Sequence, residues 1–189
     1  RAADSTRLKR WVFERFRDLA ERAEILRGDG KPVPPGLRLA CLLGEFFVYG
    51  PIRDQLGLRR ARWAYTGGAP LGPDTFRFFR SIGVNLKQVY GSTETVGFVS
   101  QQPDGEANPT SAGRAYPGLE VRVADRGEVL IRGAGVFKGY FKAEDATREV
   151  LDAEGWFHTG DARFFDPRGH VVIIDRAKDV GRLAGGTIF

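Results

Sequence analysis

The sequence contains little cysteine and little histidine. Its one cysteine, Cys41, excludes a disulfide bond within the chain and a metal site built from several cysteines. The two histidines, His158 and His170, belong to no cluster with the spacing of a zinc site. A serine hydrolase would need a Gly-x-Ser-x-Gly turn or a similar one, which Gly91-Ser92-Thr93 does not supply. The composition therefore argues against zinc chemistry and against a Ser-His-Asp site.

Long apolar runs are also missing. None approaches the ~20 residues that a helix needs to cross a bilayer, and the opening "RAADSTRLKRW" lacks the apolar core of a signal peptide. Apolar residues still make up 42% of the 189 residues, enough for one medium domain or two small ones. Together with the single cysteine, these features predict a cytoplasmic location and no transmembrane segment.

Acidic residues are fewer than basic ones, and the net charge is +5. The basic residues, mostly arginine, are scattered instead of gathered in one tract, and no nucleic-acid-binding motif accompanies them. We therefore expect a solvated arginine-rich surface and no nucleic-acid partner. An anionic substrate is the second interpretation.

The first part of the sequence alternates between helical and strand patterns. Apolar residues recur at helical spacing after Asp4 or Ser5, either of which can cap a helix. "LRLACLLGEFFVY" is apolar on almost every side, which predicts a buried helix. The expected elements are helices over residues 5–27, 37–49 and 74–83 and strands within 60–66 and over 84–91. This order predicts an α/β segment over residues 1–112.

From about Gly113 onward, short strands separated by turns dominate. The expected strands are "LEVRV", "EVLIR", "GWFHT" and "HVVII", with one helix over residues 144–151. Asp166, Pro167 and Gly169 fit a type I turn, and His170 beside it is expected to be solvated. The pattern fits a small β-barrel or a sandwich, and we predict a small β-barrel subdomain over residues 113–176.

Three polar clusters could carry chemistry, although each alone is more often a turn than a site. In "TGGAP", residues 66–70, the glycines leave backbone groups open to a flat ligand. In the segment Tyr90 to Glu94, a ring can stack on a base, a hydroxyl can donate to phosphate, and a carboxylate can hold Mg²⁺. The carboxylate of Asp161, at the end of "GWFHTGD", can accept hydrogen bonds from a ribose diol. In this order, the clusters indicate a nucleotide site.

A dinucleotide fingerprint is the competing motif. "GAGVFKG", residues 133–139, is close to that pattern and follows an expected strand. A true fingerprint opens directly into a helix, whereas Tyr140 and Phe141 follow here. An oxidoreductase therefore remains only a distant alternative.

Six motifs in sequence order resemble the adenylate-forming (AMP-binding) superfamily, which includes acyl-CoA synthetases, luciferases and peptide-synthetase adenylation domains. They are "TGGAPL", "YGSTE", "GEVLIRG", "KGYFK", "GWFHTGD" and "DRAKD", spread over residues 66–179. "TGGAPLGPDTFRFFR" and "DRAKDVGRLAGGTIF" are most similar to long-chain fatty acyl-CoA synthetases, whereas residues 1–60 are only loosely similar to the superfamily. The resemblance implies part of the large N-terminal domain of such an enzyme, with residues 177–189 forming a hinge and the start of a C-terminal domain.

The resemblance also implies roles for individual residues. Tyr90 would stack on adenine against the backbone of Gly67, Gly68 and Ala69, and Gln88 would reach the adenine edge. Thr93 would contact the α-phosphate and Glu94 would hold Mg²⁺, and these two are the expected catalytic residues. Asp161, helped by Arg176, would bind the ribose diol, and Lys178 falls at the hinge. The complete expected nucleotide-binding set is Gly67, Gly68, Ala69, Pro70, Gln88, Tyr90, Gly91, Thr93, Asp161 and Arg176.

The implied activity is a two-step ligation that uses a fatty acid or other carboxylic acid, ATP and CoA, with Mg²⁺ as cofactor. The family's phosphate loop, rich in Ser, Thr and Gly and carrying a Lys, does not occur in these residues, nor does the C-terminal catalytic Lys. We therefore expect a central fragment of a longer enzyme, inactive in isolation and able to self-associate. The alternatives are another adenylate-forming enzyme, such as an aryl- or short-chain acyl-CoA ligase or an adenylation domain, and a reduced nucleotide-binding module without catalysis.

Overall fold

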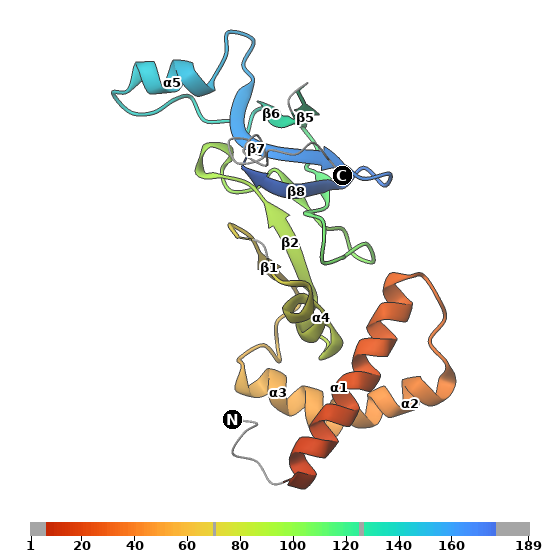
Figure 1. The fold of residues 1–189 in the computed structure, drawn as a ribbon. Helices are drawn as coiled ribbons and strands as arrows, with labels where there is room; N and C mark the ends of the chain where they lie inside the picture. The colour runs from red at the N-terminus through yellow and green to blue at the C-terminus, as the bar shows by residue number, and fades with distance from the viewer. Residues whose placement is uncertain (1–6, 70, 125–126, 177–189) are drawn as a thin grey trace, which may run out of the picture. The chain divides into compact units, whose positions relative to one another are not determined.

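The computed structural model describes residues 7–69, 71–124 and 127–176 (Figure 1). The chain divides into two compact units. Unit 1 consists of Arg1–Thr66, Pro70–Lys87 and Gly105–Pro109, and unit 2 consists of Gly67–Ala69, Gln88–Asp104 and Thr110–Phe189. The predicted division at residues 112 and 176 stays a prediction. The mixed α/β class is confirmed.

Unit 1 is built mainly from helices. The helix predicted over residues 5–27 is α1 (Arg7–Gly28), and it buries Ala20 and Ala23. The next helical run consists of α2 (Pro35–Gly44), a π-helical turn η1 (Glu45–Tyr49) and α3 (Gly50–Gln55). Figure 1 shows α1 crossing α2, so the two helices of this unit cover one another.

The π-helical turn has a cause in the sequence. Pro51 has no N–H and cannot donate to the carbonyl four residues earlier. The backbone N–H of Gly50 donates to the carbonyl oxygen of Glu45, five residues back, which is the π pattern. The turn brings Tyr49 towards α1, where its hydroxyl donates to the carbonyl oxygen of Phe16 at 2.7 Å.

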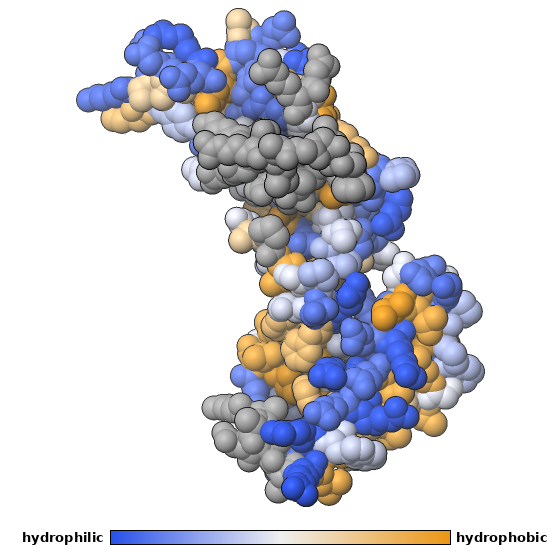
Figure 2. Space-filling view, viewed as in Figure 1, coloured by the Kyte–Doolittle hydropathy of each residue, from blue (hydrophilic) through white to orange (hydrophobic). Residues whose placement is uncertain are grey.

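The prediction that residues 37–49 form a buried helix is half right. The segment is helical, but only Gly44, Val48 and Tyr49 within it are buried. Large side chains on the rest of its surface are exposed, among them Leu39 at 60%, Leu42 at 67%, Phe46 at 77% and Phe47 at 65%. Figure 2 shows apolar colouring on this part of the surface. The helical run packs with one side on α1, and an apolar face remains on the other.

A short α/β segment follows, and its last strand crosses from unit 1 into unit 2 after Lys87. As predicted, β1 (Ala64–Thr66) is a short strand, α4 (Pro73–Ser81) is a helix that ends before Gly83, and β2 (Leu86–Tyr90) follows. The α4 helix contacts α1, and Arg80 pairs there with Glu24. The core of the unit contains Ala20, Val48, Tyr49, Phe76, Ile82, Val84 and Leu86.

Unit 2 is dominated by an antiparallel sheet of four strands in the order β5-β6-β7-β8. The strands are β5 (Leu119–Val123), β6 (Glu128–Gly133), β7 (Phe157–Phe165) and β8 (Val171–Arg176), and α5 (Glu144–Val150) precedes β7. β5, β6, β8 and α5 were expected near these positions, whereas β7 was expected only over residues 155–159 and continues through Asp161 to Phe165. The neighbouring strands of this sheet are each paired with the next, and closure into a barrel stays a prediction.

Two very short strands and one turn of 3-10 helix escaped the sequence analysis. The strands β3 (Ser100–Gln101) and β4 (Arg114–Ala115) pair with one another, and β3 also pairs with the end of β2 at Tyr90. The 3-10 turn η2 (Thr93–Thr95) follows β2. Runs of two or three residues carry too little periodicity to be read from a sequence.

The turn between β7 and β8 forms as predicted. The backbone N–H of Gly169 donates to the carbonyl oxygen of Asp166 at 2.8 Å, and Gly169 has a φ of +76°. The carboxylate of Asp166 also accepts from the backbone N–H groups of Arg168 and His170. In the part of the chain that the structure describes, no helix is long and apolar enough to span a membrane.

Candidate functional site

Of the three polar clusters predicted from the sequence, Gly67–Ala69 of the first and the whole of the second and third belong to unit 2. Gly67, Gly68 and Ala69 follow β1 and are exposed. A Cβ atom at Gly67 would lie 2.8 Å from Cγ2 of Val89, so only glycine allows this close approach to the end of β2. Gly68 has a φ of +81°, which also favours glycine. Pro70 lies outside the described residues.

The second cluster begins at the end of β2. Tyr90 is 6% exposed, and its hydroxyl donates to Oδ2 of Asp161 at 2.8 Å. A Cβ atom at Gly91 would lie 2.2 Å from the carbonyl oxygen of Gly97, so the chain folds back tightly after the strand. The side-chain amide of Gln88 donates to the carbonyl oxygen of Ser111 at 3.3 Å. Stacking of Tyr90 on adenine and a contact of Gln88 with its edge stay predictions.

The turn η2 presents Thr93 and Glu94. Ser92 precedes it and forms a reciprocal capping arrangement with Thr95, in which the backbone N–H of Ser92 donates to Oγ1 of Thr95 at 2.9 Å. This fixes the turn, and the side chain of Thr93 is left exposed. Sequence reasoning gave Ser92 no role, and the structure gives it one in holding the turn.

Glu94 is the carboxylate predicted to hold Mg²⁺. Partial burial raises its pKa, but hydrogen bonds from its own backbone N–H, from Tyr140 and from Ser92 lower it, so that the net pKa lies below its ordinary value. The hydroxyl of Tyr140 donates to Oε1 of Glu94 at 2.8 Å, and the backbone N–H of Phe137 donates to the Glu94 carbonyl oxygen at 2.7 Å. Glu94 is therefore ionised at neutral pH and held in place.

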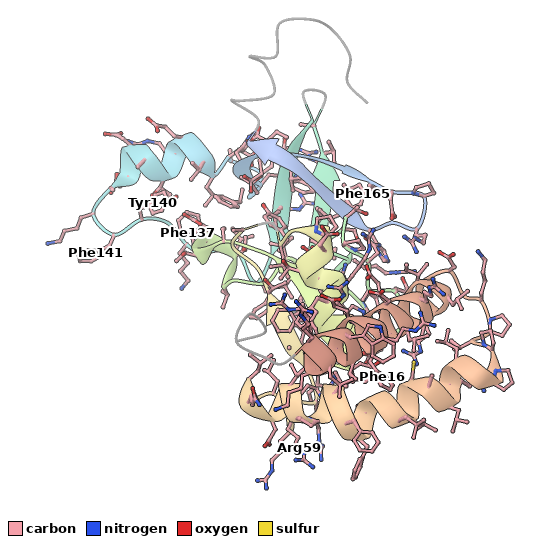
Figure 3. All side chains as sticks on the ribbon, turned by 60° about the horizontal axis from the view of Figure 1, so that its bottom comes forward. Phe16, Arg59, Phe137, Tyr140, Phe141 and Phe165 are labelled. Carbon is pink, nitrogen blue, oxygen red and sulfur yellow. The ribbon has the colours of Figure 1, made fainter. Side chains whose placement is uncertain are left out.

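Tyr140 is a residue that the sequence analysis did not assign to the site. It lies 46 residues from Glu94, in the "KGYFK" motif between β6 and α5. Its ring lies edge-on to Phe137, with 4.9 Å between the ring centroids, and Figure 3 shows both side chains in this segment. The bond to Glu94 raises the pKa of the Tyr140 hydroxyl. The motif itself was the only sequence signal for this residue.

Asp161 carries the third cluster. It lies within β7, and its backbone pairs with that of Arg176 on β8. The hydrogen bond from Tyr90 joins it to the end of β2, so the structure brings the second and third clusters together. Lys178 lies outside the described residues, and its hinge role stays a prediction.

The residues around Glu94 fit a magnesium ion by their chemistry. Mg²⁺ prefers oxygen ligands and is commonly bound through one or two carboxylates together with substrate phosphates. Among the residues that the structure describes, no group of three or more His, Cys, Asp and Glu side chains could hold a metal ion. A single ionised carboxylate beside an exposed threonine hydroxyl is compatible with a metal that takes its other ligands from a bound phosphate and water.

His170 corrects one expectation from the sequence. It was expected to be solvated, yet it is 0% exposed. Its Nδ1 lies 3.1 Å from the hydroxyl of Ser111, which is also buried, and the side chain of Gln102 donates to the Ser111 carbonyl oxygen at 2.7 Å. The residues after Ser111 pair with the start of β8: the backbone N–H of Ala112 donates to the carbonyl oxygen of Val171 at 2.8 Å, and the N–H of Val171 donates to the carbonyl oxygen of Gly113 at 2.7 Å. A Ser–His pair enclosed in this way is structural.

The dinucleotide alternative loses its structural support. After β6 ends at Gly133, the chain makes a turn and then runs without helix until α5 begins at Glu144. "GAGVFKG" therefore presents no helix N-terminus to a pyrophosphate.

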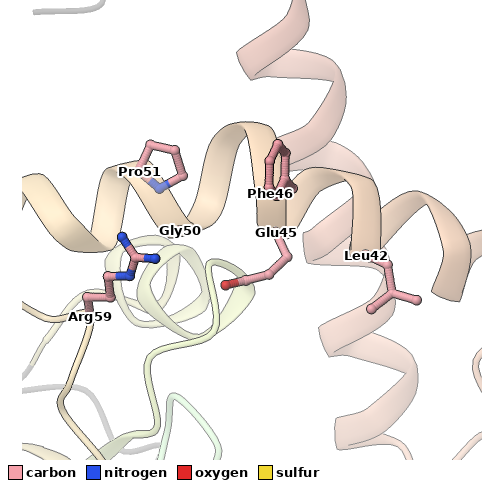
Figure 4. A pocket seen from close by; sticks show the side chains of 6 residues that line it. All are labelled: Leu42, Glu45, Phe46, Gly50, Pro51 and Arg59. Atoms are coloured by element: carbon pink, nitrogen blue, oxygen red, sulfur yellow. The ribbon is translucent and has the colours of Figure 1, made fainter.

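Unit 1 contains pockets of its own that involve none of the predicted site residues. One, of about 400 Å³, is lined by Leu42, Glu45, Phe46, Gly50, Pro51 and Arg59 (Figure 4). Five of its lining residues belong to the α2–η1–α3 run and include the exposed Leu42 and Phe46, and Arg59 comes from the loop that follows. The pocket is a feature of that helical run.

Comparison with known proteins agrees with the motifs. The family described as AMP-binding enzyme matches residues 17–141. The peroxisomal long chain acyl-CoA synthetase 7 of Arabidopsis thaliana is 38% identical over 154 residues, which covers 74% of this chain and 22% of that protein. The long-chain-fatty-acid–CoA ligase 6 of Rattus norvegicus is 33% identical over 193 residues, which covers 96% of this chain and 26% of that protein. The chain thus spans about a quarter of the length of the curated relatives it matches.

Solved structures give the same fold. The ATP-bound crystal structure of MatB from Rhodopseudomonas palustris matches with a TM-score of 0.58 and 34% identity, covering 62% of this chain and 26% of that one. The anthranilate CoA ligase AuaEII in complex with anthranoyl-AMP matches with a TM-score of 0.59 at 23% identity, covering 65% of this chain and 26% of that one. At that identity the second match speaks for the fold alone.

Proposed function

The chain belongs to the AMP-binding enzyme family, and from this premise we propose that it is part of an ATP-dependent long-chain fatty acid–CoA ligase. The proposed reaction has two steps. A carboxylate attacks the α-phosphate of ATP to give acyl-AMP and pyrophosphate, and the thiol of CoA then displaces AMP to give the acyl-CoA. The acyl adenylate is needed because a free carboxylate is a poor electrophile, and AMP is a good leaving group.

The observation that carries this proposal is the hydrogen bond between Tyr90 and Asp161. It joins "YGSTE" to "GWFHTGD", two motifs that only their resemblance to the family had connected. A ring that stacks on the base and a carboxylate that accepts from the ribose diol contact the same nucleoside, so the distance between them cannot exceed its length. The bond supports that arrangement.

The proposed roles follow from the positions of the side chains. The exposed backbone of Gly67–Ala69 and the ring of Tyr90 would hold adenine, with Gln88 at its edge. Asp161, with Arg176, would hold the ribose. Thr93 would donate to the α-phosphate, and Glu94 would bind Mg²⁺. When bound, the ion would stabilise the charge that builds on the phosphate oxygens as the carboxylate attacks.

The substrate class rests on the relatives. Those from Arabidopsis thaliana and Rattus norvegicus are named as long-chain enzymes, and we propose a long-chain fatty acid on that basis. An aryl- or short-chain acid is the alternative, because the six motifs are similar to the whole superfamily and do not specify the acid. CoA as acceptor and Mg²⁺ as cofactor belong to the same proposal.

Two further parts of the proposal concern the chain as it stands. These 189 residues contain neither the phosphate loop with its Lys nor the C-terminal Lys expected of the family, so we propose that alone they do not form acyl-CoA. A cytoplasmic location stays a prediction from composition, and the Arabidopsis relative is peroxisomal by name.

The proposal is tested by measuring the exchange of labelled pyrophosphate into ATP. Protein encoded by the complete reading frame around this sequence is incubated with ATP, labelled pyrophosphate and a series of carboxylic acids. Acid-dependent exchange that is strongest with long-chain fatty acids is the expected result, and Asp161→Ala in the same protein serves as the site control. Exchange that prefers an aryl acid would favour the alternative substrate class, and no exchange with any acid would favour the reduced nucleotide-binding module.

A further inference from the structure

The strand that carries Asp161 is irregular where Asp161 lies. Leu130 of β6 pairs with His158 of β7, and Glu128 pairs with Ala162. Thr159, Gly160 and Asp161 therefore lie opposite Val129 alone. A bulge of this kind leaves residues without ladder partners and re-aims side chains. The direction of the Asp161 carboxylate thus depends on what fixes the bulge.

Glu128 spans this bulge with its two carboxylate oxygens. Oε1 accepts the backbone N–H of Gly160 at 2.9 Å. Oε2 lies 3.4 Å from Nδ1 of His158, on the other side of the bulge. Gly160 has a φ of +68°, in the left-handed region, so its N–H is turned out of the regular ladder. The carboxylate of Glu128 accepts the Gly160 N–H in place of a backbone carbonyl of β6.

Neighbouring side chains complete the arrangement. The hydroxyl of Thr159 donates to the carbonyl oxygen of Val129 at 2.9 Å and accepts the backbone N–H of Asp161 at 3.1 Å. Nε2 of His158 lies 3.5 Å from Oδ2 of Asp152, and Oδ1 of Asp152 accepts the backbone N–H groups of Glu154 and Trp156. His158 thereby joins Glu128 to the turn that precedes β7.

We propose that Glu128 is a positioning residue for Asp161: its carboxylate holds Gly160 in the bulge and so aims the Asp161 side chain at the ribose. The inference rests on the proposed function, because it takes the ribose role of Asp161 as given. It adds a residue that touches neither nucleotide nor metal and acts only through the backbone of β7. Tyr90 orders the same carboxylate from the side of β2, so Asp161 is fixed both through its backbone and through its side chain.

The test separates positioning from folding by comparing two nucleotides. AMP carries the ribose diol, and 2′,3′-dideoxy-AMP lacks it. Calorimetry on the full chain measures the ratio of their Kd values for the wild type, Glu128→Ala, Glu128→Asp and Glu128→Gln. Glu120→Ala is the matched control, since Glu120 lies on the same sheet, is 59% exposed and pairs with Arg132 away from the bulge.

We expect wild type and Glu120→Ala to prefer AMP by about tenfold or more, the value of one or two hydrogen bonds to a charged acceptor. Glu128→Ala and Glu128→Asp should lose most of that preference, because neither side chain reaches Gly160 and His158 together. Glu128→Gln should keep it, because the amide oxygen still accepts the Gly160 N–H. Binding of dideoxy-AMP should stay within about twofold throughout.

Other outcomes overturn the inference at different levels. If Glu128→Asp or Glu128→Ala binds both nucleotides with the wild-type preference, Glu128 does not position Asp161 even though the site stands. If the variants lose both nucleotides equally, with a matching fall in melting temperature, Glu128 is structural only. If Glu128→Ala does not fold, the ratio of the two Kd values in Glu128→Asp and Glu128→Gln decides whether Glu128 positions Asp161. If wild type itself shows no preference for the diol, the ribose role of Asp161 fails, and the positioning role with it.

Discussion

The hydroxyl of Tyr90 donates a 2.8 Å hydrogen bond to the carboxylate of Asp161, 71 residues further along the chain. The bond ties the end of β2 to the bulge in β7. Tyr90 also belongs to the apolar core of unit 2, together with Val99, Ala112, Val129, Ile131 and Phe157. The proposed ribose carboxylate is therefore anchored to the core, which limits the movements it can make on binding.

Asp161→Ala should weaken AMP and ATP binding together, because both nucleotides carry the same ribose. A hydrogen bond to a charged acceptor is worth roughly 1.5–3 kcal/mol, so the Kd should rise about tenfold or more. Calorimetry with each nucleotide measures this, and Asp145→Ala on α5, where the side chain is 94% exposed, is the control. An unchanged AMP affinity would return Asp161 to a purely structural role in β7.

Tyr90→Phe separates the ring of Tyr90 from its hydroxyl. The ring stays in the core, but Asp161 loses a donor, so the free energy of unfolding should fall by about 1–2 kcal/mol and the Kd for AMP should rise several-fold. Tyr90→Ala, which also removes the proposed stacking face and leaves a cavity, should cost more in both measurements. Denaturant unfolding and calorimetry on the same samples give the two numbers. A Phe variant that binds AMP like wild type would show that the hydroxyl has no part in ordering the site.

Much of the fold was predictable because it depends on local patterns. The helical spacing in α1 and α4 and the turn residues Asp166, Pro167 and Gly169 are short-range signals, and the structure confirms all of them. The burial of residues 37–49 was predicted wrongly from a local pattern. An apolar run indicates that burial is favourable, but it does not say which surface covers each side.

The contacts that make the site could not be read from the sequence. Tyr140 contacts Glu94 across 46 residues, and Tyr90 contacts Asp161 across 71. No periodicity links such positions, and they become neighbours only when the sheet of unit 2 forms. The motifs identified which residues matter, whereas the structure identified their partners.

Tyr140→Phe should weaken binding of ATP in the presence of Mg²⁺ by several-fold and leave AMP binding without metal unchanged. The phenyl ring keeps its contact with Phe137, whereas the Glu94 carboxylate loses the donor that orients it. Calorimetry with and without Mg²⁺ measures the difference, and Glu94→Gln should show the same pattern more strongly. Equal losses in both conditions would mean that Tyr140 supports the fold instead of the proposed metal ligand.

Asp166→Ala should destabilise the β7–β8 hairpin in a pH-dependent way. Burial raises the pKa of Asp166, but hydrogen bonds from the backbone N–H groups of His170 and Arg168 lower it, so the net pKa lies below its ordinary value of 3.8. A carboxylate whose folded pKa is depressed adds stability above its unfolded pKa, and the gain is lost as pH falls through the folded pKa.

We therefore expect the variant to be less stable than wild type by about 1–2 kcal/mol at pH 7, with the difference shrinking below about pH 4. Thermal unfolding over a pH series measures it. Asp74→Ala, at a side chain that is 101% exposed, is the control for the loss of a surface carboxylate. A difference between Asp166→Ala and wild type that is the same at pH 3 and pH 7 would show that the charge of Asp166 contributes nothing.

The apolar face of unit 1 should drive self-association of this chain. Leu39, Leu42, Leu43, Phe46 and Phe47 are between 49% and 77% exposed on consecutive turns of α2 and η1. Contiguous apolar surface of this kind is unfavourable in water and usually marks a contact surface. We expect light scattering to show a mass above that of the monomer, rising with concentration, and a dye for apolar surface to bind.

Replacing both phenylalanines, Phe46→Ser with Phe47→Ser, should reduce the association, since neither ring is buried and their loss leaves no cavity in the core. Phe141→Ser is the matched control: Phe141 is 88% exposed and labelled in Figure 3, and it belongs to unit 2 instead of the helical run that carries the apolar face. If the control lowers the mass as much as the double variant does, association runs through another surface. If wild type is a monomer that binds no dye, the apolar face does not cause association. That result would favour the reduced nucleotide-binding module over part of a larger ligase.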